Sequence, residues 1–471
     1  MLTLADVVEA LTTIRPAQAN TVITEAAVDS RQVIPGGLFV ALPGERADGH
    51  DFVADAFRRG ASFALIQHEV SGAFRTVDLK NGFDDASLSG VDEPLCLLVE
   101  DTLLALQQIA RFWRRKLNLR VIGITGSVGK STTKEVIAEV LGQRYRTLKN
   151  PGNMNNEIGL PLTILRLGPG YERAVLEMGF YVPGEIALLC DIAQPQIGVV
   201  TNIGTVHAER AGSQEAIYRG KSELVQALPD DGVAILNLDD PWACKMAEFA
   251  RARVFFYGLD PAAELWADGV EGLGLEGIRF RLHYRRETLH VHVPLIGQHS
   301  VHTALRAAAV GLVEGLTWQE ILDGLRQGHT QLRLTVVRSE GGALLLDDTY
   351  NASPESTLAA LNLLAELDGR KVAVLGDMLE LGPYEKQGHE IVGVRAAQVA
   401  DQLVTVGTLG RYIAEAARRA GLRSARITEC EDTDDAIVYL RKSLTGKDVV
   451  LVKGSHGVHM ERIVAALEVP A

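Results

Sequence analysis

Residues 121–132, with the sequence VIGITGSVGKST, have the side chains and the spacing of a loop that binds phosphate. Gly126 and Gly129 let the backbone turn so that its N–H groups face an anion, and Lys130 adds a positive charge. The hydroxyl of Ser131 is suited to a magnesium ion beside that phosphate. The residues that follow have the pattern of a helix whose N-terminus faces the same anion. We therefore predict a phosphate cradle between a strand and a helix.

The match to the common phosphate-loop pattern is partial, because Ile124 stands where the pattern has its first glycine. Three residues further along could complete a site for phosphate and metal. Glu177 ends the stretch AVLE, His207 follows the stretch VVTNIG, and Lys221 lies in YRGKSELV. A carboxylate and an imidazole suit a divalent ion beside phosphate oxygens. Each of these residue types is common in structural positions, and it is their combination with the loop that indicates a site.

The length and the alternation of segments predict how these residues are positioned. A chain of 471 residues exceeds one hydrophobic core, and roughly 150 residues per domain suggests three domains. Apolar segments of strand length alternate with helical patterns throughout, so the predicted fold class is α/β. We place the domains at residues 1–100, 101–328 and 329–471. The second is expected to hold a mostly parallel sheet, and the third a Rossmann-like one.

Several charged side chains follow apolar strands in the third domain. Asp347, Asp348, Asp377 and Lys453 end or follow such segments. In parallel sheets, ligands bind beyond the carboxyl ends of the strands, so these residues are candidates for a binding site. No GxGxxG pattern follows any of these strands, and a dinucleotide site is therefore not predicted.

The composition excludes several classes of protein. A net charge of −13 argues against nucleic-acid binding, which depends on Lys and Arg neutralising phosphates. The four cysteines are far apart, so we expect buried thiols rather than disulfides or a zinc site. No apolar run approaches the ~18 residues needed to span a bilayer, and no basic leader is present. We expect a cytoplasmic protein, and a monomer because no coiled-coil pattern or exposed apolar repeat is seen.

Several longer stretches resemble the Mur ligase family over nearly the whole chain. TGSVGKST, NPGNMNNEIGLPLTIL, LEMG and TNIGTVHAERAGSQEAI are similar, in sequence and order, to the central ATPase domain of that family. DDTYNASP, AVLGDMLELG and LVKGSHG resemble its MurF type in particular. DSRQVIPGGLFVALPGERADGHDF resembles the uridine-nucleotide domain that the MurE and MurF types share.

The resemblance implies a set of site residues and ligands. It implies contacts to ATP from Thr125, Gly126, Ser127, Val128, Gly129, Lys130, Ser131, Thr132, Arg333 and Asp348. It implies Mg²⁺ ligands at Ser131, Glu177, His207 and Lys221, the last as a carbamate, with Lys130, Glu177, His207 and Lys221 as catalytic residues. It implies substrate contacts from Ser30, Arg31, Gly44, Asp48, His50, Asn153, Asn155, Asn156, Asn351 and Lys453.

The activity implied by this resemblance is an ATP-dependent ligation. The expected substrates are UDP-N-acetylmuramoyl-tripeptide and D-alanyl-D-alanine, joined through an acyl phosphate. The sequence departs from the family pattern at Ser300 and Thr303, where asparagine is usual, at His456, where arginine is usual, and before Arg333, which lacks its usual glycine. Three alternatives therefore stay open: a related ligase that adds a single amino acid, a non-catalytic nucleotide-binding relative, and a mechanical NTPase.

Overall fold

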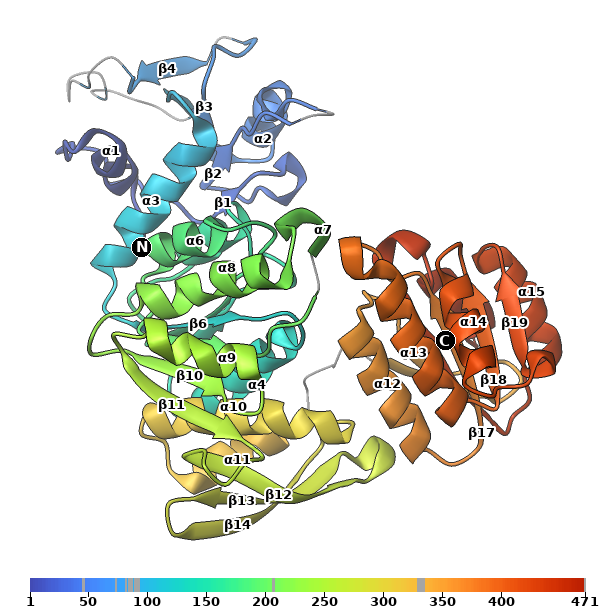
Figure 1. Ribbon diagram of the computed structural model, residues 1–471. Helices are drawn as coiled ribbons and strands as arrows, with labels where there is room; N and C mark the ends of the chain where they lie inside the picture. The colour runs from blue at the N-terminus through green and yellow to red at the C-terminus, as the bar shows by residue number, and fades with distance from the viewer. Residues whose placement is uncertain are drawn as a thin grey trace.

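A computed structural model describes residues 1–44, 47–72, 74–80, 83, 88, 94–205, 208–327 and 335–469 of the chain. Its described strands form three sheets, which follow one another along the sequence (Figure 1). The N-terminal part lies above the central part in this view, and the C-terminal part lies beside the central one. The expected α/β class is confirmed, whereas the exact domain bounds stay a prediction. Among the described residues, every helix is too short or too polar to cross a lipid bilayer.

The N-terminal sheet has the strand order β1-β2-β3-β5-β4, and all its described pairs are parallel. Its strands are β1 (Ala26–Ala27), β2 (Gly37–Val40), β3 (Ala61–Ile66), β4 (Arg75–Asp78) and β5 (Leu95–Leu98). The helices of this region are α1 (Leu4–Thr12), α2 (Val53–Arg58) and α3 (Thr102–Lys116).

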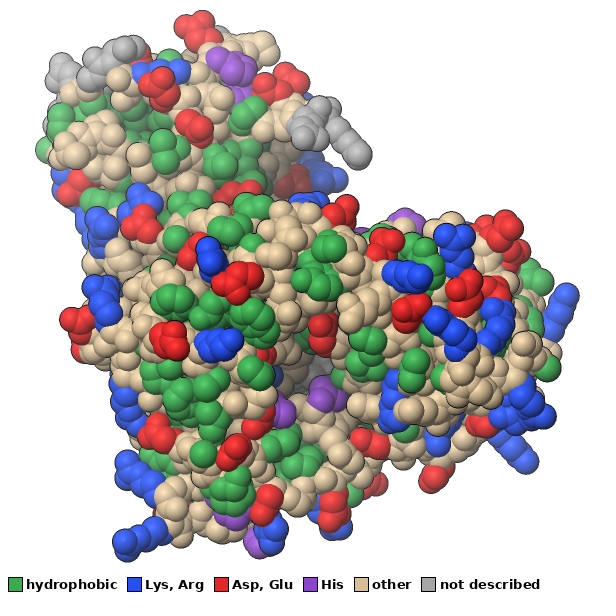
Figure 2. Space-filling model, viewed as in Figure 1, with side chains coloured by type: hydrophobic (Ala, Val, Ile, Leu, Met, Phe, Trp, Pro, Cys, Tyr) green, Lys and Arg blue, Asp and Glu red, His purple; other side chains and the backbone are tan. Residues whose placement is uncertain are grey.

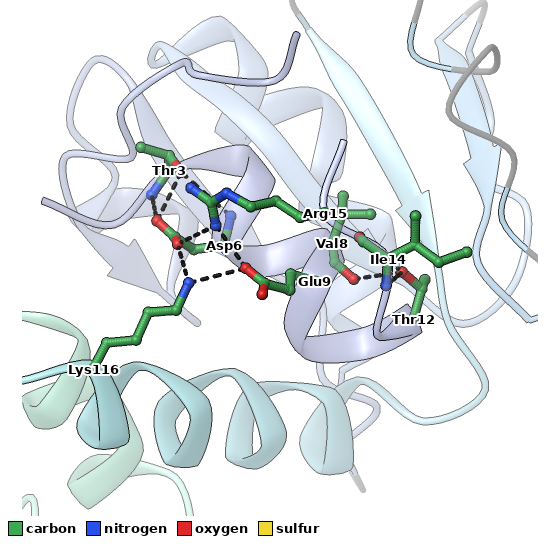
Figure 3. Close-up of polar contacts among 8 residues, drawn as sticks. All are labelled: Thr3, Asp6, Val8, Glu9, Thr12, Ile14, Arg15 and Lys116. Atoms are coloured by element: carbon green, nitrogen blue, oxygen red, sulfur yellow. Dashed lines mark hydrogen bonds and ion pairs between the residues drawn. The ribbon is translucent and has the colours of Figure 1, made fainter. Parts of the chain in front are cut away.

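Helix α1 is held against α3 by a cluster of charges (Figure 3). Asp6 accepts a hydrogen bond from Lys116 at 2.9 Å and another from Arg15 at 2.8 Å. Glu9 accepts from the same two cations. Thr3 caps α1 and also donates to Asp6. Because Lys116 is the last residue of α3, this cluster joins the first helix of the chain to the helix that leads into the central sheet.

The central sheet has the order β14-β13-β12-β11-β10-β9-β6-β8-β7 in the described chain. Its strands are β6 (Arg120–Thr125), β7 (Thr147–Lys149), β8 (Arg173–Glu177), β9 (Ile197–Val200), β10 (Val233–Asn237), β11 (Arg253–Gly258), β12 (Leu265–Gly272), β13 (Ile278–Tyr284) and β14 (Glu287–Val293). The pairs from β7 to β12 are parallel, which confirms the expected mostly parallel sheet. The antiparallel extension β12-β13-β14 was not predicted.

Helices cover both faces of the central sheet. They are α4 (Lys130–Gly142), α5 (Gly159–Leu165), α6 (Glu185–Ala193), α7 (Ala208–Ala211), α8 (Gln214–Ala227), α9 (Pro241–Lys245), α10 (Val301–Val313) and α11 (Trp318–Arg326). One apolar core includes residues of α4, α10 and α11. The other includes residues of α5, α6 and α8 and is continuous with the core of the N-terminal sheet.

The C-terminal sheet has the order β15-β16-β20-β17-β18-β19, and only its β15-β16 pair is antiparallel among the described strands. Its strands are β15 (Thr335–Arg338), β16 (Leu344–Asp348), β17 (Arg370–Gly376), β18 (Gln402–Val406), β19 (Ile427–Cys430) and β20 (Asp448–Lys453). Its helices are α12 (Pro354–Glu366), α13 (Glu385–Val399), α14 (Gly410–Arg419), α15 (Thr433–Ser443) and α16 (Glu461–Leu467). They pack on both faces of the sheet, as in the expected Rossmann-like arrangement.

Short 3₁₀ turns complete the described structure. They are η1 (Ser30–Gln32), η2 (Gly49–Phe52), η4 (Met246–Phe249), η5 (Gly274–Glu276), η6 (Gln298–Ser300), η7 (Gly382–Tyr384), η8 (Ser424–Arg426) and η9 (His456–Val458). The four cysteines are free, as expected; three are buried, whereas Cys244 is only half-buried.

Candidate active site

The predicted phosphate loop lies between the end of β6 and the start of α4. Gly126 has a φ of 142°, and a Cβ there would lie 1.8 Å from Oγ1 of Thr201, so only glycine fits at this point. Gly129 has a φ of 81° and is the N-cap residue of α4. Because the helix begins at Lys130, the positive end of its dipole faces the space beside the loop.

The segment that follows β9 holds the loop in shape. The backbone N–H of Ser127 donates to the carbonyl of Asn202, and that of Val128 donates to the Asn202 side chain, both at 2.9 Å. The hydroxyl of Ser127 accepts a hydrogen bond from Gly204 N–H at 2.8 Å. This one segment therefore fixes the backbone of the loop at Ser127 and Val128.

A buried carboxylate faces the first turn of α4. Glu177 ends β8 and is 1% exposed. Its Oε2 accepts a hydrogen bond from the Ser131 hydroxyl at 2.7 Å, and its Oε1 accepts one from Asn155 at 3.0 Å. Asn150, which is fully buried, pairs with the backbone of Glu177 through both atoms of its side-chain amide. Lys134 anchors the same segment by donating to the carbonyl of Asn150 at 2.8 Å.

Two lysines share one carbonyl of the loop. Nζ of Lys130 donates to the carbonyl of Gly126 at 2.8 Å, and Nζ of Lys221 donates to it at 2.9 Å. Lys221, on α8, is 1% exposed and lies over the ring of Phe180. Burial lowers the pKa of the Lys221 amine well below its usual range, and the positive charge of Lys130 adds to the effect. A neutral amine is the form that can react with CO₂.

The C-terminal sheet supplies the opposite wall. Asp348 and Lys453 are paired in register at the ends of β16 and β20. Their side chains form an ion pair at 2.8 Å, and Lys453 also donates to the carbonyl of Asn351 at 2.8 Å. These residues line the same cavity of about 410 Å³ as the phosphate loop and Glu177. Figure 2 shows the hollow between the central and C-terminal parts, with histidine side chains at its rim. Of the four residues expected beyond strand ends, Asp348 and Lys453 line this cavity, whereas Asp347 and Asp377 are not among its lining residues; their binding roles stay predictions.

Helix α10 and the turn before it form a third wall, which the sequence analysis linked only to Ser300 and Thr303. His299, Thr303 and Arg306 line the cavity there. Burial lowers the pKa of His299 to about 4, and the charges of His302 and Arg306 act in the same direction. Nothing in the spacing of an Ala-rich helix singles out Arg306, since one arginine in such a helix usually faces solvent.

The substrate-binding residues expected in the N-terminal domain lie apart from this cavity, at turns beside β2 and β3. His50 is buried, and its Nδ1 donates to Asp48 at 2.5 Å while its Nε2 accepts from the N–H of Gln67 at 2.9 Å. Among the described residues, Asp48, His50 and His68 are the one group of three His, Cys, Asp or Glu side chains whose possible ligand atoms all lie within 4.8 Å of one another, but both ring nitrogens of His50 are already engaged. His50 therefore ties the turn η2 to the residue that follows β3.

The other expected residues of this region are surface groups or turn positions. Ser30 donates to Asp55 at 2.9 Å, and Arg31 pairs with Asp29 at 2.7 Å on an exposed side chain. A Cβ on Gly44 would lie 2.8 Å from the carbonyl of Ala47, so the turn there is tight.

The asparagines of the segment 150–156 have different roles. Asn155 contacts Glu177, whereas Asn156 accepts from Gly159 N–H at 2.9 Å at the start of α5. The carbonyl of Asn153 accepts from Asn155 N–H at 2.8 Å. His207 and Arg333, both expected in the site, lie outside the described residues, so their roles stay predictions.

Comparison with known families places this geometry in context. A family model described as "Mur ligase middle domain" matches residues 124–311. Models for "Mur ligase, glutamate ligase domain" and "Mur ligase family, catalytic domain" match residues 332–456 and 22–114.

Similar proteins match along nearly the whole chain. The UDP-N-acetylmuramoyl-tripeptide–D-alanyl-D-alanine ligase of Bacillus subtilis is 36% identical, with 96% of this chain and 94% of the relative covered. A crystal structure of MurF from Acinetobacter baumannii superposes with a TM-score of 0.83 at 30% identity, covering 98% of this chain and 97% of that one. MurF ligase from Thermotoga maritima in complex with ADP gives a TM-score of 0.78 at 29% identity, covering 94% and 96%.

Proposed function

This chain belongs to the Mur ligase family, and we propose that it joins D-alanyl-D-alanine to the terminal carboxylate of UDP-N-acetylmuramoyl-tripeptide with cleavage of ATP. It is an ATP-dependent ligase that forms an amide bond. The observation that carries the proposal is one cavity in which a phosphate loop, a buried carboxylate and a wall from the C-terminal sheet meet. That cavity lies in a chain whose relatives with this named activity match it from end to end.

The reaction begins by activating a carboxylate that water alone would leave inert towards an amine. A carboxylate oxygen of the tripeptide attacks the γ-phosphorus of ATP, and the bond between that phosphorus and the oxygen that bridges to the β-phosphate breaks. ADP departs, and the tripeptide then carries an acyl phosphate. The amine of D-alanyl-D-alanine then attacks the acyl carbon, loses a proton and expels phosphate. The first turn of α4 and Lys130 hold the nucleotide phosphates in line and neutralise charge, which is most of what phosphoryl transfer requires.

The residues present fit a magnesium ion. The oxygens of Ser131 and Glu177 lie 2.7 Å apart beside the phosphate loop, and both are the hard ligands that Mg²⁺ prefers. Bound there, Mg²⁺ would neutralise charge on the phosphate oxygens. A carbamate on Lys221, formed when the neutral amine adds to CO₂ and loses a proton, would add an anionic ligand, and His207 would add an imidazole.

We assign the remaining residues by region. The N-terminal turns with Ser30, Arg31, Gly44, Asp48 and His50 are proposed to bind the uridine nucleotide. Asn153, Asn155 and Asn156 are proposed to face the peptide arm.

Asn351 and Lys453, on the C-terminal wall, are proposed to face the incoming amine, and Arg333 to join Asp348 at the nucleotide. We further propose domains at residues 1–100, 101–328 and 329–471 and a monomeric protein. The consumption of ATP favours a cytoplasmic location.

The experiment is a product assay by mass spectrometry with a panel of UDP-muramoyl peptides and amine donors, combined with phosphate release. We expect a pentapeptide product and phosphate only when both the UDP-tripeptide and D-alanyl-D-alanine are present. If a product forms with a single amino acid as the donor, the chain is instead a related ligase that adds one amino acid. Phosphate release with neither substrate, or none with both, would overturn the proposal.

A further inference from the structure

Arg306 is a buried cation in the wall of the active-site cavity. It lies on α10 and is 5% exposed. Its Nη1 donates to the hydroxyl of Tyr257 at 3.2 Å and its Nη2 to the hydroxyl of Thr303 at 2.8 Å. Its Nε has no hydrogen-bond partner. The guanidinium therefore has two neutral partners and one buried N–H that is unsatisfied.

The described part of the chain supplies no carboxylate within ion-pair distance of Arg306. The nearby Asp239 is paired with His302 at 2.7 Å, and Asp348 on the far wall is paired with Lys453 at 2.8 Å. Burying a charge costs free energy, and an arginine cannot avoid that cost by losing its proton at ordinary pH. A buried ion that has neither a counter-charge nor a full set of hydrogen bonds is strongly unfavourable, so such a group is expected where a ligand brings the opposite charge.

The position of Arg306 identifies the charge that is missing. Its Nη2 lies 3.5 Å from where a Cβ on Gly129 would be. Gly129 immediately precedes Lys130, so the guanidinium borders the phosphate loop from the side of α10. Both Arg306 and the loop line the same cavity. An anion held at the N-terminus of α4 would thus have Lys130 on its own loop and Arg306 on the neighbouring helix.

We propose that Arg306 is a nucleotide-binding residue of this chain, whose guanidinium takes the phosphate chain of the adenine nucleotide as its counter-charge. This inference rests on the proposed function. It also gives a role to Thr303, one of the positions at which the sequence departs from the family pattern. The Thr303 hydroxyl, one helical turn before Arg306, accepts from Nη2 and fixes the direction of the guanidinium.

The test measures binding of ADP, AMP and adenosine, and thermal unfolding, for the full-length protein and its variants. In Arg306→Met, we expect ADP to bind about 10- to 100-fold more weakly, the range for one charge-assisted hydrogen bond. Adenosine should bind as it does to the unsubstituted chain. The AMP result assigns the contact to the α-phosphate if affinity falls as for ADP, and to the β-phosphate if it does not. Arg306→Lys keeps the charge and should retain part of the ADP affinity.

Arg114 provides a matched control, because it is equally buried but satisfied by backbone carbonyls. Its Nε donates to Ala193 at 2.8 Å, and its two other nitrogens donate to Leu117 and Leu119. Without ligand, Arg306→Met should be at least as stable as the unsubstituted chain, since it removes an unpaired buried charge. Arg114→Met should be less stable and bind ADP normally.

Two results would overturn the inference while leaving the proposed function intact. One is an Arg306→Met variant that is destabilised like Arg114→Met yet binds ADP normally, because Arg306 would then be structural. The other is an equal loss of ADP and adenosine affinity, which would place the contact at the base. If the unsubstituted chain binds no ADP at all, the proposed function itself fails, and this inference fails with it.

Discussion

The shape of the phosphate loop depends on the missing side chain of Gly126. Gly126 packs so closely on Thr201 that a methyl group would overlap its hydroxyl, and its φ of 142° is one that other residues rarely adopt. We predict that Gly126→Ala shifts the loop and lowers the ligation rate by about 100-fold, the usual scale for a 1 Å misplacement. Gly184→Ala is the control, because Gly184 also has a positive φ but no neighbour within 4 Å of an added Cβ. Equal activity of both variants would contradict this account.

Lys130 is the second residue of the loop whose substitution should lower the rate of the reaction. Its amine lies on the carbonyl of Gly126, next to the space where a phosphate would bind. Lys130→Met removes one preorganised charge, so kcat should fall by about 10² to 10³. The measurement is phosphate release with both substrates at saturation, together with a melting curve. A variant with normal kcat would show that the loop does not bind the transferred phosphate.

Elements that the sequence predicted well are those whose signal is local. At residues 121–141 the sequence predicts a strand, then a glycine turn with a lysine, then a helix. This order could be predicted because each residue type there serves one physical purpose. The role of Arg306 was not readable, because its partners Tyr257 and Gly129 are distant in sequence and meet it only through sheet packing. The alternating pattern of β13 is itself a strand signal; what the sequence does not show is that β12 pairs with β11 and so adds the extension β12-β13-β14 to the central sheet.

The anchoring of α1 on α3 predicts a pH dependence at the scale of elements. Burial of Asp6 favours its neutral form, but hydrogen bonds from Arg15, Lys116 and Thr3 outweigh this and hold its pKa well below the usual range. A carboxyl with a lowered folded-state pKa stabilises the fold fully above its unfolded pKa of about 3.9, and the stabilisation is lost as the pH falls below that value.

Asp6→Asn should therefore reduce the free energy of unfolding by about 1–3 kcal/mol at pH 7, the cost of losing hydrogen bonds to a charged group. The difference between the variant and the unsubstituted chain should shrink as the pH falls below about 4, because Asp6 then becomes neutral in the unfolded state while the folded state still holds it charged; the difference is lost completely only as the pH reaches the lowered folded-state pKa. Urea unfolding at several pH values measures this. A constant difference at all pH values would mean that the charge of Asp6 contributes nothing.

The C-terminal part meets the central part at several places, and at two of them a backbone N–H of the central part donates a hydrogen bond across the boundary. Glu355 on α12 accepts from Thr205 N–H at 3.3 Å, and the carbonyl of Glu380 accepts from Glu209 N–H on α7 at 3.3 Å. Figure 1 shows α7 next to the C-terminal part. An acyl phosphate is destroyed by water, so a ligase of this kind depends on walls that meet around the intermediate. The contact between the central and C-terminal parts is therefore needed for the ligation reaction as well as for the fold.

Gly382 tests that requirement, because it lies where the two parts touch. A Cβ on Gly382 would lie 2.8 Å from Cα of Glu209, which is backbone and cannot move aside as a side chain would. We predict that Gly382→Ala wedges the C-terminal part away from α7 and lowers kcat for ligation by about 10²-fold, since the amine and the acyl phosphate are no longer aligned. Gly421→Ala is the matched control in the same sheet domain, with a positive φ of 102° and no atom within 4 Å of an added Cβ. Backbone strain alone would affect both variants, whereas a wedge affects only Gly382→Ala. Equal ligation rates for the two would mean that this contact is not part of the state in which the reaction occurs.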